Sequence, residues 1–153
     1  MDRSGLETHF AEFLALFAEN TRGHVIDQVI EDRYILFKAR ELFDYLEKEK
    51  AVLFGAFDQN KLIGFLWAYP RVFLEESRIY INAMIIADQY RGKGIGKLLV
   101  SELEKYAEEN NILAIDVQTA SFKTDAIEFY HKLGFVHERV QMRKSLVASG
   151  KSK

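Results

Sequence analysis

The stretch Tyr90-Arg91-Gly92-Lys93-Gly94-Ile95-Gly96 decides the fold prediction, because three glycines and two cations stand together between two regular segments. An apolar run from Ile79 to Ala87 precedes it and an amphipathic stretch from Lys97 to Glu109 follows it, which predicts a strand, a tight turn and a helix. Glycine lets the backbone approach an anion closely, and the first amides of a helix have no partner within the helix. The turn is therefore a predicted phosphate-binding site.

Two well-known phosphate-binding motifs can be tested against this turn. A dinucleotide-binding Gly-x-Gly-x-x-Gly would need glycine where Lys97 or Leu99 stands. A Walker loop that ends at Gly96 and Lys97 would need glycine at Arg91 and Ser or Thr at Leu98. Neither motif is present, and the pattern that remains is Arg-x-x-Gly-x-Gly.

This remaining pattern resembles the signature of the GNAT superfamily of acyl-CoA-dependent N-acyltransferases, which is Gln/Arg-x-x-Gly-x-Gly/Ala. Alone, the pattern would arise by chance in about one chain of this length in six or seven. A second match follows about thirty residues later, where Ala126 to Phe135 predicts a short helix that carries Phe-Tyr and closes on Leu-Gly-Phe. Two signatures in order and at the usual spacing indicate a member of this superfamily. The resemblance is clearest from Tyr80 to Phe135 and extends from Val52 to Lys144.

Bulk composition agrees with one compact domain. A chain of 153 residues with 48% hydrophobic and 29% charged residues is large enough to bury a core. The net charge of -2 and the pI near 6.1 argue against nucleic-acid or membrane partners. The absence of cysteine excludes disulfides, thiolate metal sites and a cysteine nucleophile. With no apolar signal core and no apolar run near the roughly 18 residues that span a bilayer, a cytoplasmic location is predicted.

The periodicity of apolar residues predicts alternating helices and strands. Helices are expected at residues 6–17, 39–48, 94–110 and 124–133, and strands at residues 51–57, 62–69, 78–87, 114–119 and 136–144. The resemblance implies an α/β GNAT fold, with a mixed, mostly antiparallel central sheet of about six or seven strands flanked by helices. We expect a single acetyltransferase domain over residues 1–146 and a flexible C-terminal tail over residues 147–153.

The resemblance implies that acetyl-CoA is the cosubstrate. The residues themselves predict no metal site. The turn and the start of the next helix would hold the pyrophosphate, through Arg91, Gly92, Lys93, Gly94, Ile95, Gly96 and Lys97. The pantetheine arm would pair like an added strand with the backbone of Met84, Ile85 and Ile86. Lys123 stands where the family often has Asn, and it either contacts a CoA phosphate or faces water.

Three residues are candidates for the chemistry that the resemblance implies. A backbone amide near Met84 would polarise the thioester carbonyl. Tyr130 matches the family tyrosine that contacts CoA and protonates the departing thiolate, and its alternative is a core aromatic beside Phe129. Asn82 would orient a water or hold the acceptor amine.

No general base can be assigned from the sequence. The strand from Arg78 to Met84 has no carboxylate. The loose candidates are Glu31, Glu75 and Glu76, for which a solvated loop position is the favoured interpretation. The histidines lack the spacing of a zinc-binding helix, although His24 lies in the region where family members shape the acceptor site.

The resemblance therefore implies an N-acetyltransferase that moves an acetyl group from acetyl-CoA to a primary amine by direct attack in a ternary complex. The acceptor would be a small-molecule or peptide amine, and Glu75 and Glu76 hint at a cationic one. Three alternatives stay open: transfer of a longer acyl group, a non-catalytic CoA-binding sensor or structural protein, and a generic nucleotide-binding module. Family habit implies a homodimer.

Overall fold

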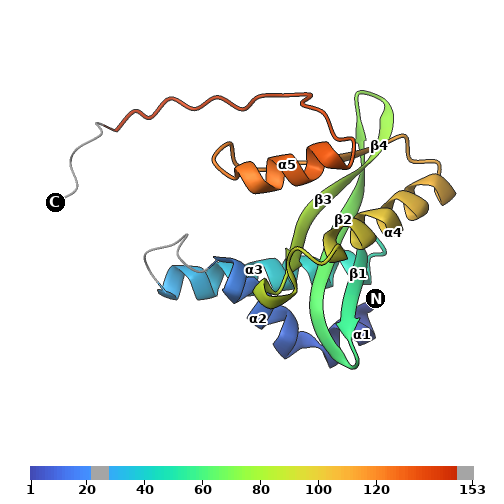
Figure 1. Cartoon of the computed structure of the whole chain (residues 1–153), viewed down its shortest axis with the longest axis vertical. Helices are drawn as coiled ribbons and strands as arrows, with labels where there is room; N and C mark the ends of the chain where they lie inside the picture. Colours follow the sequence, from blue (N-terminus) through green and yellow to red (C-terminus); the bar gives the residue numbers. More distant parts are fainter. Residues whose placement is uncertain (22–27, 148–153) are drawn as a thin grey trace. The chain divides into compact units, whose positions relative to one another are not determined.

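The computed structural model describes residues 1–21 and 28–147 of the chain, which form two compact units divided after Gln118. The elements carry the labels of Figure 1. In the first unit they are α1 (Arg3–Thr8), α2 (Phe10–Thr21), α3 (Gln28–Glu47), β1 (Val52–Asp58), β2 (Lys61–Phe73), β3 (Glu76–Ile86), the 3-10 helix η1 (Asp88–Tyr90), α4 (Ile95–Glu109) and β4 (Ala114–Val117). The second unit, from Thr119, contains α5 (Thr124–Lys132).

The sheet of the first unit has the order β1-β2-β3-β4. The strands β1, β2 and β3 are antiparallel neighbours, whereas β4 runs parallel to β3. The last β3 residue paired with β4 is Ile81, opposite Val117, while the pairing with β2 continues to Ile86. Residues 82–86 of β3 therefore have a strand neighbour on one side only among the described residues.

A β-bulge interrupts β3 at Asn82. Trp67 lies opposite Ala83 and Ala68 lies opposite Ile81, so that Asn82 has no counterpart on β2. Ala83 packs against the core cluster made with the N-terminal helices, whereas Ile81 is buried outside that cluster. An extra residue of this kind bends a strand and turns its following backbone groups. The bulge lies at the end of the paired region of β3 and β4.

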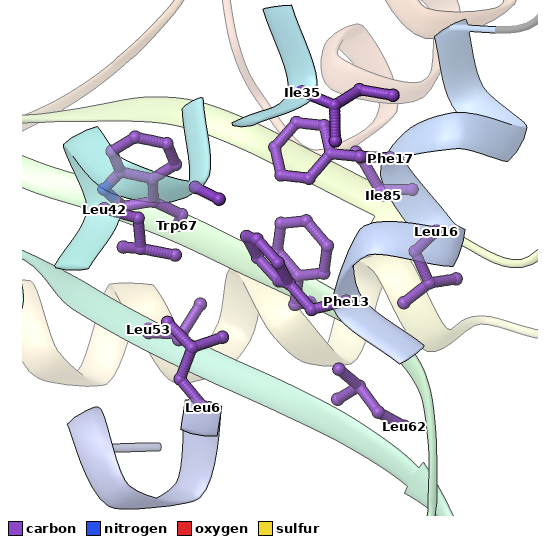
Figure 2. Close-up of a cluster of buried hydrophobic side chains, with 12 residues drawn as sticks. Leu6, Phe13, Leu16, Phe17, Ile35, Leu42, Leu53, Leu62, Trp67 and Ile85 are labelled. Carbon is purple, nitrogen blue, oxygen red and sulfur yellow. The ribbon is translucent and has the colours of Figure 1, made fainter. Parts of the chain in front are cut away.

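The core of the first unit lies between the sheet and its N-terminal helices. Phe13 is central, with ring centroids 4.6 Å from Phe65 and 5.0 Å from Phe17. Helix α4 contacts all four strands of the sheet. The buried cluster on the helical side comprises Leu6, Phe13, Leu16, Phe17, Ile35, Ala39, Leu42, Leu53, Leu62, Phe65, Trp67 and Ile85 (Figure 2).

The predicted number of six or seven strands is wrong, because four strands form in the described part of the chain. Residues 136–144, predicted as a strand, form neither strand nor helix. Their apolar side chains are exposed, with Val136 at 84%, Val140 at 82% and Met142 at 90%. A strand requires a hydrogen-bonded neighbour, and alternation of apolar residues in one segment does not supply one.

The helices also differ from their predicted bounds. The helix predicted over residues 6–17 is two helices, α1 and α2, divided at His9. Helix α3 begins at Gln28, well before the predicted start at residue 39. The exposed side chains of Tyr34, Leu36 and Phe37 blur the apolar periodicity of its first half. Of the predicted C-terminal tail, only Val147 falls within the described residues.

No helix in residues 1–21 and 28–147 combines the length and apolar character needed to cross a membrane.

Candidate functional site

The glycine turn between β3 and α4 has the backbone that only glycine adopts easily. Gly92 has φ 75° and Gly94 has φ 82°, both in the left-handed region. A Cβ built at either residue would meet no heavy atom within 4 Å beyond its chain neighbours. The two glycines are therefore explained by their backbone conformation, and the space beside the turn is open.

Helix α4 begins at this turn without a capping side chain. Gly94 is its N-cap residue, and the first turn contains no acidic residue. The amide of Leu98 donates to the Gly94 carbonyl at 3.1 Å, so the amides of Ile95, Gly96 and Lys97 precede the first intrahelical bond. The positive end of the helix dipole adds to these donors. This combination suits a bound anion such as a phosphate.

The cations of the turn have different surroundings. Arg91 is turned toward the protein, because its Nε donates to the Ile86 carbonyl at 3.1 Å and its Nη1 lies 2.9 Å from Asp88 Oδ1. Lys93 is exposed, with its Nζ 5.2 Å from the centroid of the Tyr90 ring. Lys93 and Lys97 form no ion pair with any residue that the structure describes. The two lysines are thus the cations available to an anion.

Two distant carboxylates hold the short helix η1 that leads into the turn. Glu19, in α2, accepts a hydrogen bond from the amide of Asp88 at 2.7 Å. Asp58, the last residue of β1, accepts one from the Tyr90 hydroxyl at 2.6 Å. The first contact separates its partners by 69 residues and the second by 32. The turn is therefore fixed to α2 and to the β1–β2 hairpin.

The edge of β3 leads directly to this turn. Met84 and Ile86 are half-buried and Ile85 is buried, and all three pair with β2. At the bulge, the side-chain Nδ2 of Asn82 is buried and has no hydrogen-bond partner in the described part of the chain. The strand residues predicted to bind pantetheine are therefore followed directly by η1 and by the turn predicted to bind phosphate.

A family model described as "Acetyltransferase (GNAT) family" matches residues 13–135, a span that contains the bulged strand, the glycine turn and α5. The chain belongs to the GNAT acetyltransferase family. The family uses acetyl-CoA, and membership supports an acyltransferase activity.

Individual relatives of this GNAT protein are distant. The "Uncharacterized N-acetyltransferase YdgE" of Bacillus subtilis (strain 168) is 26% identical over 89 residues, which cover 58% of this chain and 57% of that protein. The chain spans about half the length of the curated relatives it matches.

Solved structures share the fold of this GNAT chain over nearly its whole length. One is the aminoglycoside acetyltransferase meta-AAC0020 in complex with trehalose, which comes from an uncultured soil metagenomic sample. It has a TM-score of 0.72 at 20% identity, and the match covers 96% of this chain and 93% of that one. AAC(6')-Iy, in complex with the bisubstrate analog CoA-S-monomethyl-acetylneamine, has a TM-score of 0.71 at 18% identity, with 96% and 95% covered. At these identities the likeness shows the fold alone.

The second unit of the GNAT chain carries the predicted tyrosine. Tyr130 lies on α5 and is buried, with ring centroids 5.1 Å from Phe129 and 5.2 Å from Phe135. Burial raises the pKa of the Tyr130 phenol to about 12. Lys123 is the exposed N-cap residue of the same helix. Tyr130 therefore packs beside Phe129, as its alternative interpretation expects, and its role as general acid stays a prediction.

The carboxylates considered as bases have specific surroundings. Glu76 lies 2.5 Å from Arg78 Nε, whereas Glu75 is exposed in the turn between β2 and β3. The side chain of Glu31 and the whole of His24 lie outside the described part of the structure. In residues 1–21 and 28–147, no three His, Asp or Glu side chains form a group that could hold a metal ion.

Sequence reasoning missed Asp116, on β4. Its side chain is only 15% exposed and contacts two guanidinium groups, Arg71 Nη2 at 2.5 Å and Arg78 Nη1 at 3.1 Å. A charged residue within the short apolar strand Ala-Ile-Asp-Val was the signal that could have identified it. The sequence offered no such signal for Glu19 or Asp58, because both contacts depend on the fold.

Proposed function

We propose that this GNAT protein transfers an acetyl group from acetyl-CoA to a primary amine by direct attack in a ternary complex. One observation supports this most strongly. Strand β3, which beyond Ile81 has a strand neighbour on one side only among the described residues, runs through two left-handed glycines into a helix whose first amides have no side-chain cap. Such a unit offers peptide groups to the amides of pantetheine and helix donors to the phosphates.

The phosphates of acetyl-CoA would bind at the glycine turn. The amides of Ile95, Gly96 and Lys97 would donate to the pyrophosphate, and the Lys93 and Lys97 side chains would supply positive charge. Arg91 would act mainly by holding the turn, because it is already bonded to Asp88 and Ile86. We retain Lys123 as a further candidate for a phosphate contact.

The reacting carbonyl would lie beside β3. The thioester supplies the acyl carbon that an amine can attack, and a backbone amide near Met84 would donate to the oxygen as negative charge develops there. Donors that are already oriented cost no reorganisation at that moment. The bulge at Asn82 supports this assignment, because it changes the direction of the backbone groups just before Met84.

As the new C–N bond replaces the C–S bond, Tyr130 would donate a proton to the departing thiolate, and the proton that the nitrogen loses would pass to water. The raised pKa of Tyr130 means that the phenol carries its proton throughout the neutral range. The attacking amine must be unprotonated, and the nearby carboxylates of Glu76 and Asp116 are bonded to arginines. We therefore propose that the amide of Asn82 orients the amine or a water, and we assign no base.

The acceptor is proposed to be a small-molecule or peptide amine. One compared structure is named as an aminoglycoside acetyltransferase and the other holds a bisubstrate analog, CoA-S-monomethyl-acetylneamine, which supports the small-molecule class. We propose a cytoplasmic location, which the cysteine-free sequence supports. We also propose a homodimer, which the resemblance to the family supports. Transfer of a longer acyl group is the enzymatic alternative, and competition between acyl-CoA chain lengths decides it.

A non-catalytic CoA-binding protein is the second candidate, favoured by the paired state of Glu76 and Asp116. The decisive experiment is the melting temperature with and without saturating acetyl-CoA, with ATP and NAD as controls. Ligand at a hundred times its Kd adds about 2.7 kcal/mol and shifts a domain of this size by several degrees.

A shift specific to acetyl-CoA, followed by thiol release with a panel of amines, is the result expected of the enzyme. Binding without turnover on any amine favours the sensor. No shift, or an equal shift with ATP, contradicts the assignment of the glycine turn to CoA.

A further inference from the structure

We propose that Asp58 is a positioning residue for the cofactor phosphates, and that it acts through Tyr90 on the Lys93 ammonium. The inference rests on the proposed binding of acetyl-CoA at the glycine turn. It assigns a function in cofactor recognition to a hairpin residue that contributes nothing to the sequence signature.

The side chains of Asp58, Tyr90 and Lys93 contact one another in turn, just before and within the glycine turn. Asp58 Oδ2 accepts a hydrogen bond from the Tyr90 hydroxyl at 2.6 Å, and the Lys93 Nζ lies 5.2 Å from the centroid of the Tyr90 ring. A cation at this distance from an aromatic face is attracted by the ring quadrupole. A phenol that donates to a carboxylate gains electron density on its ring, so the bond to Asp58 strengthens the attraction for Lys93.

Asp58 is placed by secondary structure and not by the turn itself. It ends β1, it lies opposite Lys61 across a two-residue hairpin loop, and β1 is paired with β2 along its length. The Asp88 end of η1 is held separately, by the hydrogen bond from its amide to Glu19. Tyr90 is therefore held between two fixed elements, which suits a group that must present its ring in one orientation.

Of the lysines available to an anion at the turn, Lys93 is the one that lies over the Tyr90 ring. Arg91 is already oriented by Asp88 and by the Ile86 carbonyl. Lys93 has no carboxylate partner among the described residues, and it is exposed. A lysine side chain has many rotamers, and restricting them before the anion arrives reduces the entropy lost on binding.

An ordinary structural role for Asp58 makes a different prediction. Aspartate is common beside tight turns, where it stabilises the hairpin whatever ligand is bound. If Asp58 had only this role, replacing it would lower the stability of the protein whether or not Lys93 is present. The positioning role predicts instead that the effect of Asp58 on CoA affinity disappears once Lys93 is removed.

The experiment is a set of double-mutant cycles on CoA binding, measured by titration calorimetry on the full chain. The variants are Asp58→Asn, Tyr90→Phe and Lys93→Met, alone and in pairs. Asp44→Asn, an exposed aspartate of α3, and Tyr106→Phe, a half-buried tyrosine of α4, are the matched controls. Asp58→Glu tests rescue, and the melting temperature without ligand reports any loss of stability.

We expect Asp58→Asn and Tyr90→Phe each to weaken CoA binding by about two- to fivefold. The pair should weaken it no more than either change alone, and neither should have a further effect in the Lys93→Met background. The two control variants should bind as the wild type does, and Asp58→Glu should recover part of the affinity.

Either of two results overturns the inference alone: unchanged CoA affinity in Asp58→Asn and Tyr90→Phe, or an equal loss with and without Lys93. A wild-type protein that does not bind CoA overturns the proposed function together with it. The two failures are therefore distinguishable in the first titration.

Discussion

The guanidinium of Arg71, on β2, reaches past the intervening strand β3 to the carboxylate of Asp116 on β4, with Nη2 and Oδ2 2.5 Å apart. Arg78, on β3, contacts the other oxygen of the same carboxylate at 3.1 Å. One side chain thus joins three strands at the end where β3 and β4 are paired. The parallel pair β3–β4 is only four residues long, and the contacts of Asp116 add to its few backbone hydrogen bonds.

Replacing Asp116 with Asn should lower the free energy of unfolding by about 1–3 kcal/mol, because two guanidinium groups lose a charged acceptor in a half-buried setting. Urea unfolding measures the change. Asp44→Asn, on the exposed face of α3, is the control and should alter the stability little. An Asp116 variant as stable as the wild type would show that the ion pairs of Asp116 with Arg71 and Arg78 do not hold β4.

Gly94→Ala should abolish the increase in melting temperature that acetyl-CoA produces. The new residue must keep φ near 82° or distort the turn, and its methyl group would enter the space beside the helix amides. Asn111→Ala is the matched control, since Asn111 has φ 56° just beyond the other end of α4. Both variants should lose about 1 kcal/mol of stability, but only Gly94→Ala should lose the ligand effect.

Tyr130→Phe should lower the turnover number by about a hundredfold or more while leaving CoA affinity unchanged, because only the proton donor is removed. Single-turnover kinetics with an accepted amine separates chemistry from binding. A rate equal to that of the wild type, when chemistry limits, would mean that another group protonates the thiolate.

Burial of Tyr130 should also make stability depend on pH in a defined window. The unfolded phenol titrates near 10.0 and the folded one near 12, so the folded state holds its proton more tightly. The resulting stabilisation is complete below pH 10 and is lost as the pH rises toward 12, by about 2–3 kcal/mol in all.

The difference in unfolding free energy between wild type and Tyr130→Phe separates the contribution of Tyr130 from that of the other tyrosines and the lysines. It should be constant below pH 9 and should shift in favour of the variant from pH 10 upward. A difference that stays constant to pH 11.5 would contradict a raised pKa.

The features that the sequence predicted correctly have local causes. The glycine turn, the start of α4 and the two neighbouring strands predicted at residues 51–57 and 62–69 each follow from residues close together in the chain. Glycine conformation, turn chemistry and apolar periodicity act over a few residues, and so a sequence displays them directly.

The features that the sequence did not predict depend on partners far away in the chain. The bulge at Asn82 exists only relative to β2, and the alternating residues after Val136 form no strand because no described segment pairs with them. The carboxylates of Glu19 and Asp58 belong to the site through contacts across 69 and 32 residues. No pattern within one segment specifies such a pairing.

The uncapped start of α4 restricts how this protein can be made more heat-resistant. Introducing Ser, Asp or Asn at a helix N-cap is a standard stabilising change, because the side chain satisfies an open amide. At Gly94 the same change would place an oxygen on the donors that the proposed ligand needs, and the left-handed backbone disfavours it as well. Stabilising substitutions should therefore be sought in the first turns of the other helices, and the start of α4 should be left as it is.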